Sequence, residues 1–174
     1  ILFTSGSTGV PKGVVVGHDA IGNRLAWSQA TYPIRPDDRV LHSASFGFDI
    51  AAWELFGPLR AGATVVVPRE GEHKDPAALV RLMREERITV AHFVPSMFQL
   101  VVEEPGLEEC AALRHVFSGG EALGSGLAER FRQHSGAVLW TQYGPTEGTV
   151  DATFWRCRGE EPRGGVAIGR PAGS

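Results

Sequence analysis

Short apolar runs alternate with segments of helical periodicity along most of the chain. Apolar runs bounded by polar or glycine-rich residues indicate buried strands, and apolar residues three and four positions apart indicate helices. The expected strands cover residues 1–4, 13–16, 39–43, 63–67, 89–93, 113–117 and 138–141. The expected helices cover residues 18–32, 51–56, 76–86, 96–103 and 126–134, with Asp75 as the N-cap of the third.

This order of elements predicts the fold class. The first two strands surround a glycine-rich turn, which predicts a hairpin. From residue 18 onward, helices and strands alternate, which predicts an α/β fold with a largely parallel sheet flanked by helices. No internal repeat, low-complexity tract or linker divides the chain, so residues 1–174 form one unit.

Polar or glycine-rich segments follow several of the expected strands. Ligands bind beyond the carboxyl ends of the strands in sheets of this kind. We therefore expect these segments to converge on one shared site. They cover residues 4–13, 45–49, 118–121 and 142–147.

Composition excludes several classes of function. The 17 basic and 20 acidic residues give a net charge of −3, which argues against nucleic acid or membrane binding as the main activity. The apolar runs are too short to span a bilayer, and the sequence shows no signal-peptide pattern, so nothing in it indicates export. Cys110 and Cys157 form no CxxC motif, and the cysteines and histidines show no metal-ligand spacing. A reduced, cytoplasmic setting is expected.

The first candidate site is the segment TSGSTGVPKG at residues 4–13. Its hydroxyls, backbone N–H groups and Lys12 can hold phosphate oxygens. It is not a Walker loop, because Pro11 stands where that motif requires glycine and no Ser or Thr follows Lys12. Taken alone, it could also be an ordinary turn rich in glycine and serine.

Two further segments offer complementary groups. QYGPTE at residues 142–147 supplies an aromatic face, a hydroxyl and the Glu147 carboxylate, a ligand type that Mg²⁺ prefers, although Gly-Pro alone indicates only a turn. SGGE at residues 118–121 follows a strand. Its glycines would let the backbone approach a ligand, and the alternative is a simple strand-end turn.

Asp49 and His92 each allow two interpretations. Asp49 lies at a strand–helix junction in SFGFDIAAWELF, where it could be an N-cap or a ligand for a cation. Trp53 in the same segment could be plain helix core. His92 interrupts an apolar strand, where a hydrogen-bonded core histidine is the common outcome.

The segments at 4–13 and 142–147, in this order, closely resemble motifs of the adenylate-forming superfamily. That superfamily includes acyl-CoA ligases, luciferases and the adenylation domains of nonribosomal peptide synthetases. The segment around Asp49 resembles the amino-acid-activating members, in which this aspartate pairs with the α-ammonium of the substrate. Acyl-CoA ligases generally lack that aspartate. The chain is therefore most similar to an amino-acid adenylation domain, over essentially all 174 residues.

The resemblance implies a reaction and its cofactors. ATP and an amino acid would form an aminoacyl-adenylate and pyrophosphate, with Mg²⁺ held by Glu147. The acyl group would then pass to the phosphopantetheine thiol of a carrier domain within a synthetase. Lys12, Thr146 and Glu147 would carry catalysis. The implied nucleotide-binding residues are Thr4, Ser5, Gly6, Ser7, Thr8, Gly9, Lys12, Gly119, Gly120, Glu121, Tyr143, Gly144 and Thr146.

The resemblance also implies a substrate pocket. Because polar groups lining a pocket reject apolar side chains, we expect a polar substrate: glutamate, glutamine or serine. The alternatives are an acyl- or aryl-CoA ligase, or a non-catalytic nucleotide-binding module. The implied pocket residues are Asp49, Ile50, Trp53, His92, Phe117, Gly119, Gln142, Val150 and Asp151.

The ends of the chain lead to a further expectation. The sequence lacks the ribose-binding aspartate motif, the hinge and the lysine-bearing C-terminal lid of the superfamily. We therefore expect part of the large N-terminal subdomain, cut at both ends, with weak or no activity on its own.

Overall fold

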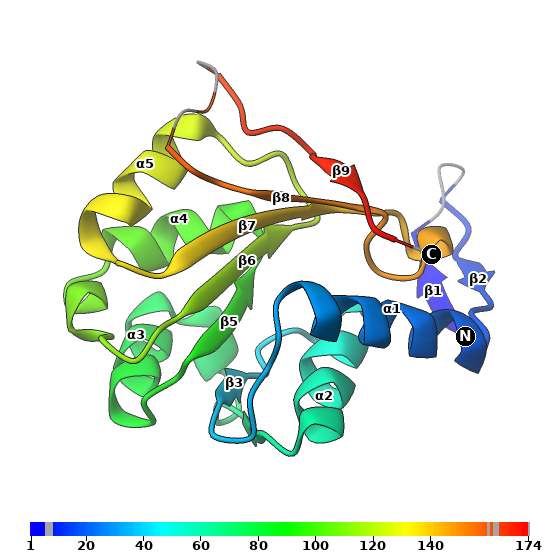
Figure 1. Ribbon diagram of the computed structural model, residues 1–174, viewed down its shortest axis with the longest axis horizontal. Coiled ribbons are helices and arrows are strands. Elements are labelled where there is room, and N and C mark those ends of the chain that lie inside the picture. Colours follow the sequence, from blue (N-terminus) through cyan, green and yellow to red (C-terminus); the bar gives the residue numbers. More distant parts are fainter. Residues whose placement is uncertain (6–8, 160, 162–163, 174) are drawn as a thin grey trace.

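A seven-stranded sheet forms the centre of the computed structural model, which describes residues 1–5, 9–159, 161 and 164–173 (Figure 1). The strand order is β4-β3-β5-β6-β7-β8-β9. Strands β4 to β7 are parallel, whereas β8 and β9 are antiparallel additions at one edge. The bounds are β3 Arg39–Leu41, β4 Thr64–Val66, β5 Val90–Phe93, β6 His115–Gly119, β7 Val138–Tyr143, β8 Thr153–Arg156 and β9 Arg170–Pro171. The expected largely parallel sheet is confirmed, and its two antiparallel strands were not predicted.

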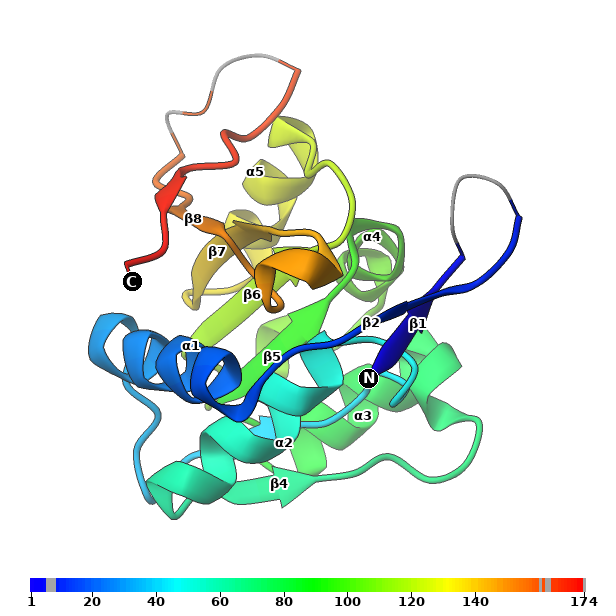
Figure 2. The same ribbon diagram turned by 90° about the vertical axis from the view of Figure 1, so that its right-hand side faces the viewer.

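The first two strands form a separate antiparallel hairpin. β1 (Leu2–Thr4) pairs with β2 (Lys12–Val14), with Thr4 opposite Lys12. Figure 2 shows the hairpin projecting from the body of the protein. The predicted hairpin is confirmed.

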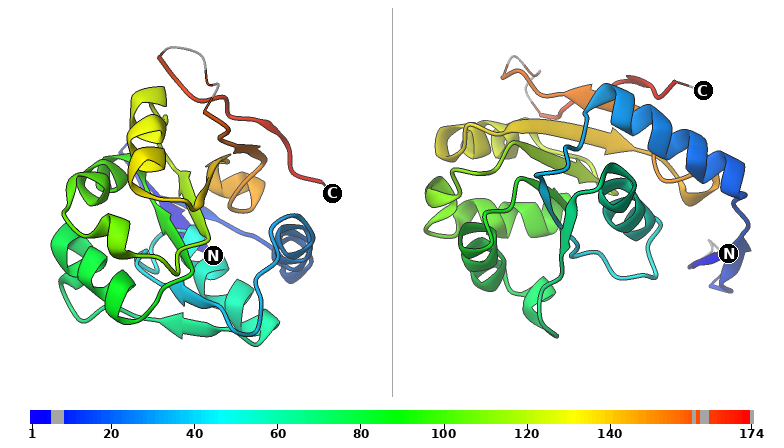
Figure 3. Two further views of the ribbon diagram at one scale, coloured as in Figure 1. Left: turned by 60° about the vertical axis from the view of Figure 1, so that its left-hand side comes forward. Right: turned by 60° about the horizontal axis from the view of Figure 1, so that its bottom comes forward.

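Helices cover both faces of the main sheet (Figure 3). Two helices lie on one face, α1 (His18–Thr31) and α2 (Ile50–Ala61). Three lie on the other face, α3 (Pro76–Glu85), α4 (Pro95–Glu103) and α5 (Ser125–His134). Three short 3₁₀ helices complete the described elements: η1 (Glu72–Lys74), η2 (Leu107–Glu109) and η3 (Thr146–Gly148).

Strand β5 separates two apolar cores because successive side chains point to opposite faces of a sheet. Ala91 and Phe93 join the larger core with α3, α4 and α5. Val90 joins the smaller core with α1 and α2, which also contains Trp53 and Phe117. All four residues of β5 are buried, as expected for a central strand with helices on both faces.

Two helix boundaries test the local predictions. Asp75 Oδ1 accepts hydrogen bonds from the N–H groups of Ala77 and Ala78, at 3.0 and 3.2 Å, which confirms the predicted N-cap. Helix α2 was predicted to end at residue 56, and this was wrong, because the helix continues through Pro58 to Ala61. Gly57 and Pro58 are both buried, with Gly57 next to Trp53 and Ile34 of the smaller core, and this burial outweighs their helix-breaking tendency. Gly62 ends the helix with φ at 75°.

Both cysteines are buried free thiols. Burial raises the pKa of Cys110, and it raises the pKa of Cys157 to about 12, so neither is a reactive thiolate. Among the described residues, no helix has the length and apolar character needed to cross a membrane.

Candidate functional site

A cavity of about 590 Å³ lies at the carboxyl ends of β3, β5, β6 and β7. Polar segments that follow these strands meet there, as predicted from their positions after strands. A larger hollow of about 670 Å³ lies near the amino end of β7, but none of the predicted site residues lines it. The 590 Å³ cavity is lined by Ser43, Ala44, Ser45, Phe48, Asp49, Ile50, His73, Lys74, His92, Phe93, Val94, Met97, Gly119, Gly120, Glu121, Gly144, Pro145, Thr146 and Asp151.

Asp49 lies at the wall of this cavity, directly before α2. Its backbone already has helical angles, φ −66° and ψ −30°, and its side chain makes no capping hydrogen bond. An N-cap residue normally has an extended backbone and accepts a bond from the first turn. The capping interpretation therefore fails, and the carboxylate of Asp49 is free to pair with a cation in the cavity.

His92 reaches the same cavity from the centre of the sheet. Its side chain is buried, and burial lowers its pKa even though Glu54, Asp151 and Asp49 act in the opposite direction. The imidazole is therefore neutral at pH 7. A neutral imidazole offers a cavity ligand one donor or one acceptor rather than a charge.

Asp151 is buried, and its carboxylate pairs with the guanidinium of Arg24 on α1. Arg24 also donates to the hydroxyl oxygen of Tyr32 at 2.9 Å. The amide of Gln142 donates to the same oxygen, also at 2.9 Å. Sequence reasoning missed Arg24 and Tyr32, because helical periodicity does not reveal a partner so far away in the chain. The predicted hydrogen-bonding capacity of Asp151 and Gln142 is therefore partly used within the protein.

Four predicted pocket residues do not line the cavity. All four are buried, and Trp53 and Phe117 belong to the smaller core. The rings of Trp53 and Phe117 lie 5.1 Å apart between centroids, and the Trp53 indole donates to Ser28 Oγ at 3.3 Å. These four residues are Trp53, Phe117, Gln142 and Val150.

Two glycines bring strand-end segments unusually close together. A Cβ at Gly119 would lie 2.9 Å from the backbone oxygen of Gln142, and one at Gly144 would lie 2.6 Å from Asp151 Cα. Thr149 and Val150, which precede Asp151, have φ values of 63° and 75°, a region that β-branched residues rarely adopt. Strained backbone of this kind clusters at functional sites.

Comparison with known proteins decides the family. The model of the family described as "AMP-binding enzyme" matches residues 1–174. The chain belongs to this family.

Its relatives include large synthetases. The chain is 43% identical to tyrocidine synthase 3 of Brevibacillus parabrevis over 98% of its own length and 3% of that protein. It is 44% identical to enterobactin synthase component F of Escherichia coli, over 92% of its own length and 13% of that protein. The chain thus spans only a small part of these relatives.

Solved structures give the same result. The Vibrio cholerae adenylation domain AlmE, in complex with glycyl-adenosine-5'-phosphate, matches with a TM-score of 0.91 and 29% identity. That match covers 99% of this chain and 32% of AlmE. The nonribosomal peptide synthetase FmoA3 matches with a TM-score of 0.89 and 31% identity, over 98% of this chain and 18% of FmoA3. The expected fold, part of the N-terminal subdomain of adenylation domains, is confirmed.

In this AMP-binding enzyme, the predicted phosphate loop belongs to the hairpin. Thr4 and Lys12 pair across it, and Ser5 and Gly9 flank its tip, while Gly6, Ser7 and Thr8 lie outside the described residues. The hairpin lies at the end of the protein where β7 leads into η3 (Figures 1 and 2). None of its described residues lines the cavity, so their contact with phosphates stays a prediction.

The remaining residues predicted to bind nucleotide lie at or near the cavity rim. Tyr143 is half exposed at the end of β7, and Glu147 is exposed on η3. Glu121 lines the cavity, but its carboxylate accepts hydrogen bonds from Ser96 N at 3.0 Å and Ser96 Oγ at 3.1 Å. Glu121 therefore fixes the start of α4. Its contact with nucleotide stays a prediction.

A metal would depend on the nucleotide for most of its ligands. In the part of the chain that the structure describes, no three His, Cys, Asp or Glu side chains are grouped so that they could hold a metal ion. Mg²⁺ commonly binds through one or two carboxylates together with substrate phosphates. The exposed carboxylate of Glu147, next to cavity-lining Thr146, fits that arrangement.

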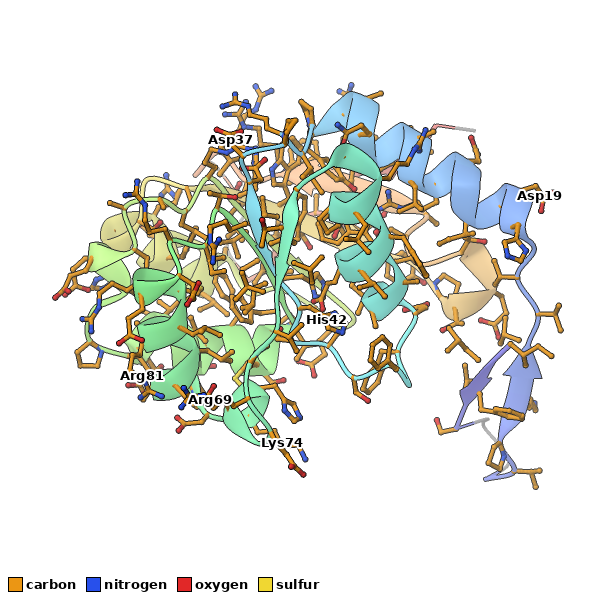
Figure 4. The ribbon with its side chains drawn as sticks, turned by 90° about the horizontal axis from the view of Figure 1, so that it is seen from below. Asp19, Asp37, His42, Arg69, Lys74 and Arg81 are labelled. Carbon is orange, nitrogen blue, oxygen red and sulfur yellow. The ribbon has the colours of Figure 1, made fainter. Side chains whose placement is uncertain are left out.

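The structure adds cavity residues that the sequence did not indicate. His73 and Lys74 come from η1, between β4 and α3, and Figure 4 labels Lys74 on that segment. Met97 comes from α4. None of them lies in a recognisable motif. Lys74 brings a positive charge to a wall that also carries Asp49.

Proposed function

We propose that this chain forms the amino-acid and nucleotide site of an adenylation domain, which activates an amino acid with ATP. The observation that carries the proposal is the position of Asp49, a carboxylate without a capping role at the wall of a cavity shared with Gly119, Gly120 and Thr146. The family match and the glycyl-adenylate bound to the similar domain AlmE support the same chemistry.

In the proposed reaction, Asp49 pairs with the α-ammonium of the amino acid and so aims its carboxylate at the nucleotide. A bond forms between a carboxylate oxygen and the α-phosphorus of ATP. The bond from that phosphorus to the bridging oxygen of the β-phosphate breaks, and pyrophosphate leaves. No protein nucleophile is needed, so alignment and charge neutralisation supply the catalysis.

The nucleotide would be held by groups at the cavity rim and on the hairpin. Tyr143 would stack on adenine, Thr146 would donate to the α-phosphate, and Lys12 would neutralise the leaving pyrophosphate. Ser5 and Thr8 would assist Lys12. Mg²⁺, held by Glu147 and the phosphates, would supply further neutralisation of the developing charge.

We further propose a polar substrate side chain, glutamate, glutamine or serine. His92 supports this, because a neutral imidazole at the wall needs a hydrogen-bonding partner. The activated acyl group would pass to the phosphopantetheine thiol of a carrier domain. The similarity to multidomain synthetases supports that partner.

The test is amino-acid-dependent exchange of labelled pyrophosphate into ATP, using a full-length adenylation domain that carries this chain. We expect exchange with one polar amino acid, and a loss of about 100-fold in Asp49→Ala, because the partly buried charge partner of the substrate ammonium is removed. Asp37→Ala, at an exposed position outside the cavity, should retain full exchange.

Other outcomes would support the alternatives. Turnover only with carboxylic acids that lack an α-amino group would indicate an acyl- or aryl-CoA ligase. Tight ATP binding without exchange for any acid would indicate a non-catalytic nucleotide-binding module.

A further inference from the structure

Glu54 on α2 is a fully buried carboxylate that the proposed reaction does not use. Its Oε2 accepts two hydrogen bonds, from the backbone N–H of Ala44 at 3.0 Å and from His42 Nδ1 at 2.9 Å. Figure 4 labels His42, which follows β3. Its Oε1 has no hydrogen-bond partner among the described residues. A buried carboxylate oxygen without a donor is costly, so this atom requires an explanation.

The unpaired oxygen faces His92, a residue of the cavity wall. Glu54 Oε1 lies 3.9 Å from His92 Nδ1. Small rotations of the two side chains would bring the atoms to the usual hydrogen-bond distance of about 2.9 Å. A carboxylate can only accept, so a hydrogen bond between them requires the proton on Nδ1 of His92.

We propose that Glu54 is a positioning residue that fixes the tautomer of His92 and thereby selects the substrate side chain. With its proton on Nδ1, the neutral imidazole presents Nε2 to the cavity as a hydrogen-bond acceptor. The pocket then favours a side chain that carries a donor, a hydroxyl or a carboxamide. It disfavours a carboxylate, which has no proton to give. Among the proposed substrates, serine and glutamine are therefore preferred over glutamate, and this inference rests on the proposed function.

The charges around His92 are consistent with a neutral ring that accepts. Glu54, Asp49 and Asp151 are the acidic groups that favour its protonation, while burial opposes it and prevails. Asp151 is compensated by Arg24, and Asp49 would be compensated by the substrate ammonium. The acidic groups would also repel a substrate carboxylate, which adds to the selection against glutamate.

The tautomer can be measured without any assumption about activity. In ¹⁵N-labelled protein, NMR spectra that record two-bond ¹H–¹⁵N correlations of the histidine ring distinguish a protonated from an unprotonated ring nitrogen. The His92→Asn variant identifies the signals of His92 among those of the six histidines. We expect a protonated Nδ1 and an unprotonated Nε2 near pH 7. The opposite tautomer, or a doubly protonated ring, would overturn the inference even if Glu54 variants fail to fold.

Glu54→Gln provides a second, independent test. The N–H of Ala44 can only donate, so it holds the amide oxygen of the new side chain at the position of Oε2, and the NH₂ group faces His92. Nδ1 must then accept, and the proton moves to Nε2. In this variant, we expect kcat/KM for serine or glutamine, divided by kcat/KM for glutamate, to fall by about tenfold. The change should come mainly from KM.

A double variant separates positioning from a merely structural role. In a His92→Ala background, Glu54→Gln should leave the ratio of kcat/KM for serine or glutamine to kcat/KM for glutamate unchanged. An equal shift in that background would overturn the inference. If the unmodified domain exchanges pyrophosphate with no amino acid, the proposed function fails, but the tautomer measurement still tests the link between Glu54 and His92.

Discussion

The guanidinium of Arg24 and the carboxylate of Asp151 form a buried ion pair across 127 residues of sequence. The two side chains are 4% and 8% exposed. Arg24 belongs to α1 on one face of the sheet, and Asp151 follows η3 at the cavity. The pair therefore ties the first helix to the segment that completes the cavity wall.

Replacing Arg24 alone should destabilise the protein strongly. In Arg24→Leu the carboxylate of Asp151 loses its partner while it stays buried, and removal of one partner of a buried pair costs about 3–5 kcal/mol. Urea unfolding, followed by circular dichroism, measures the change. The double variant Arg24→Leu, Asp151→Leu should recover much of the loss, because no buried charge is left unpaired. A double variant no more stable than the single one would show that the loss does not come from the unpaired carboxylate of Asp151.

Gly144→Ala should be far more costly than Gly148→Ala. The added methyl group at residue 144 would meet backbone atoms of Val150 and Asp151 at 2.6 Å, whereas at residue 148 the nearest atom is Pro145 Cδ at 3.4 Å. Overpacking against backbone costs about 1–3 kcal/mol. Thermal unfolding of both variants checks this. Equal melting temperatures would contradict the close approach of the segments before and after η3.

Asp75→Ala should cost about 1 kcal/mol, because two N–H groups at the start of α3 lose their acceptor. Asp37→Ala is the control, since Asp37 is exposed and should change stability by less than about 0.5 kcal/mol. Urea midpoints of the two variants, compared at equal m-values, measure the difference. A loss as large in the control would point to a general charge effect.

His115 should make the protein less stable as the pH falls. Burial and the neighbouring Arg114 lower its pKa to about 4, and the indole N–H of Trp140 donates to its Nδ1 at 3.2 Å, which occupies that nitrogen as an acceptor. The unfolded chain takes up this proton near pH 6.5, well before the folded protein does. The contribution of His115 to the free energy of unfolding should therefore be constant above that pH and decrease between about pH 6.5 and pH 4.

The variant His115→Gln, whose amide oxygen can still accept from Trp140, should flatten part of this dependence. His92, whose pKa is also lowered, contributes in the same direction and remains in that variant. Asp38 does not confuse the comparison, because its lowered pKa affects stability only at more acidic pH. Unfolding free energies measured at a series of pH values would test this, and parallel curves for both proteins would contradict it.

Local signals in the sequence were sufficient for much of the fold. The cap at Asp75 and the glycine turn of the hairpin act through neighbouring residues, so they could be predicted from spacing alone. The position of the cavity followed from parallel strands whose carboxyl ends share one edge. Strands β8 and β9 were missed, because their antiparallel pairing depends on partners elsewhere in the chain.

The partners of the site residues were harder to predict. Nothing near Asp151 indicates that Arg24 will neutralise it, since the contact exists only after the sheet has formed. Glu54 stands beside Trp53 in an apolar helix, where its carboxylate could have been read as a surface group. Its burial between His42 and His92 depends on how α2 packs on β3 and β5.

The consecutive residues His92 and Phe93 of β5 serve different sides of the sheet, and this has an evolutionary consequence. Changes around His92 alter the chemistry of the cavity and of the small core beneath α1 and α2. The larger core, which holds most of the buried apolar residues and meets the cavity at Phe93, lies on the opposite side of the strand and keeps its packing. Proteins with this architecture can therefore acquire a new substrate through substitutions on the His92 side of β5. The core on the other side supplies the stability that allows such substitutions to accumulate.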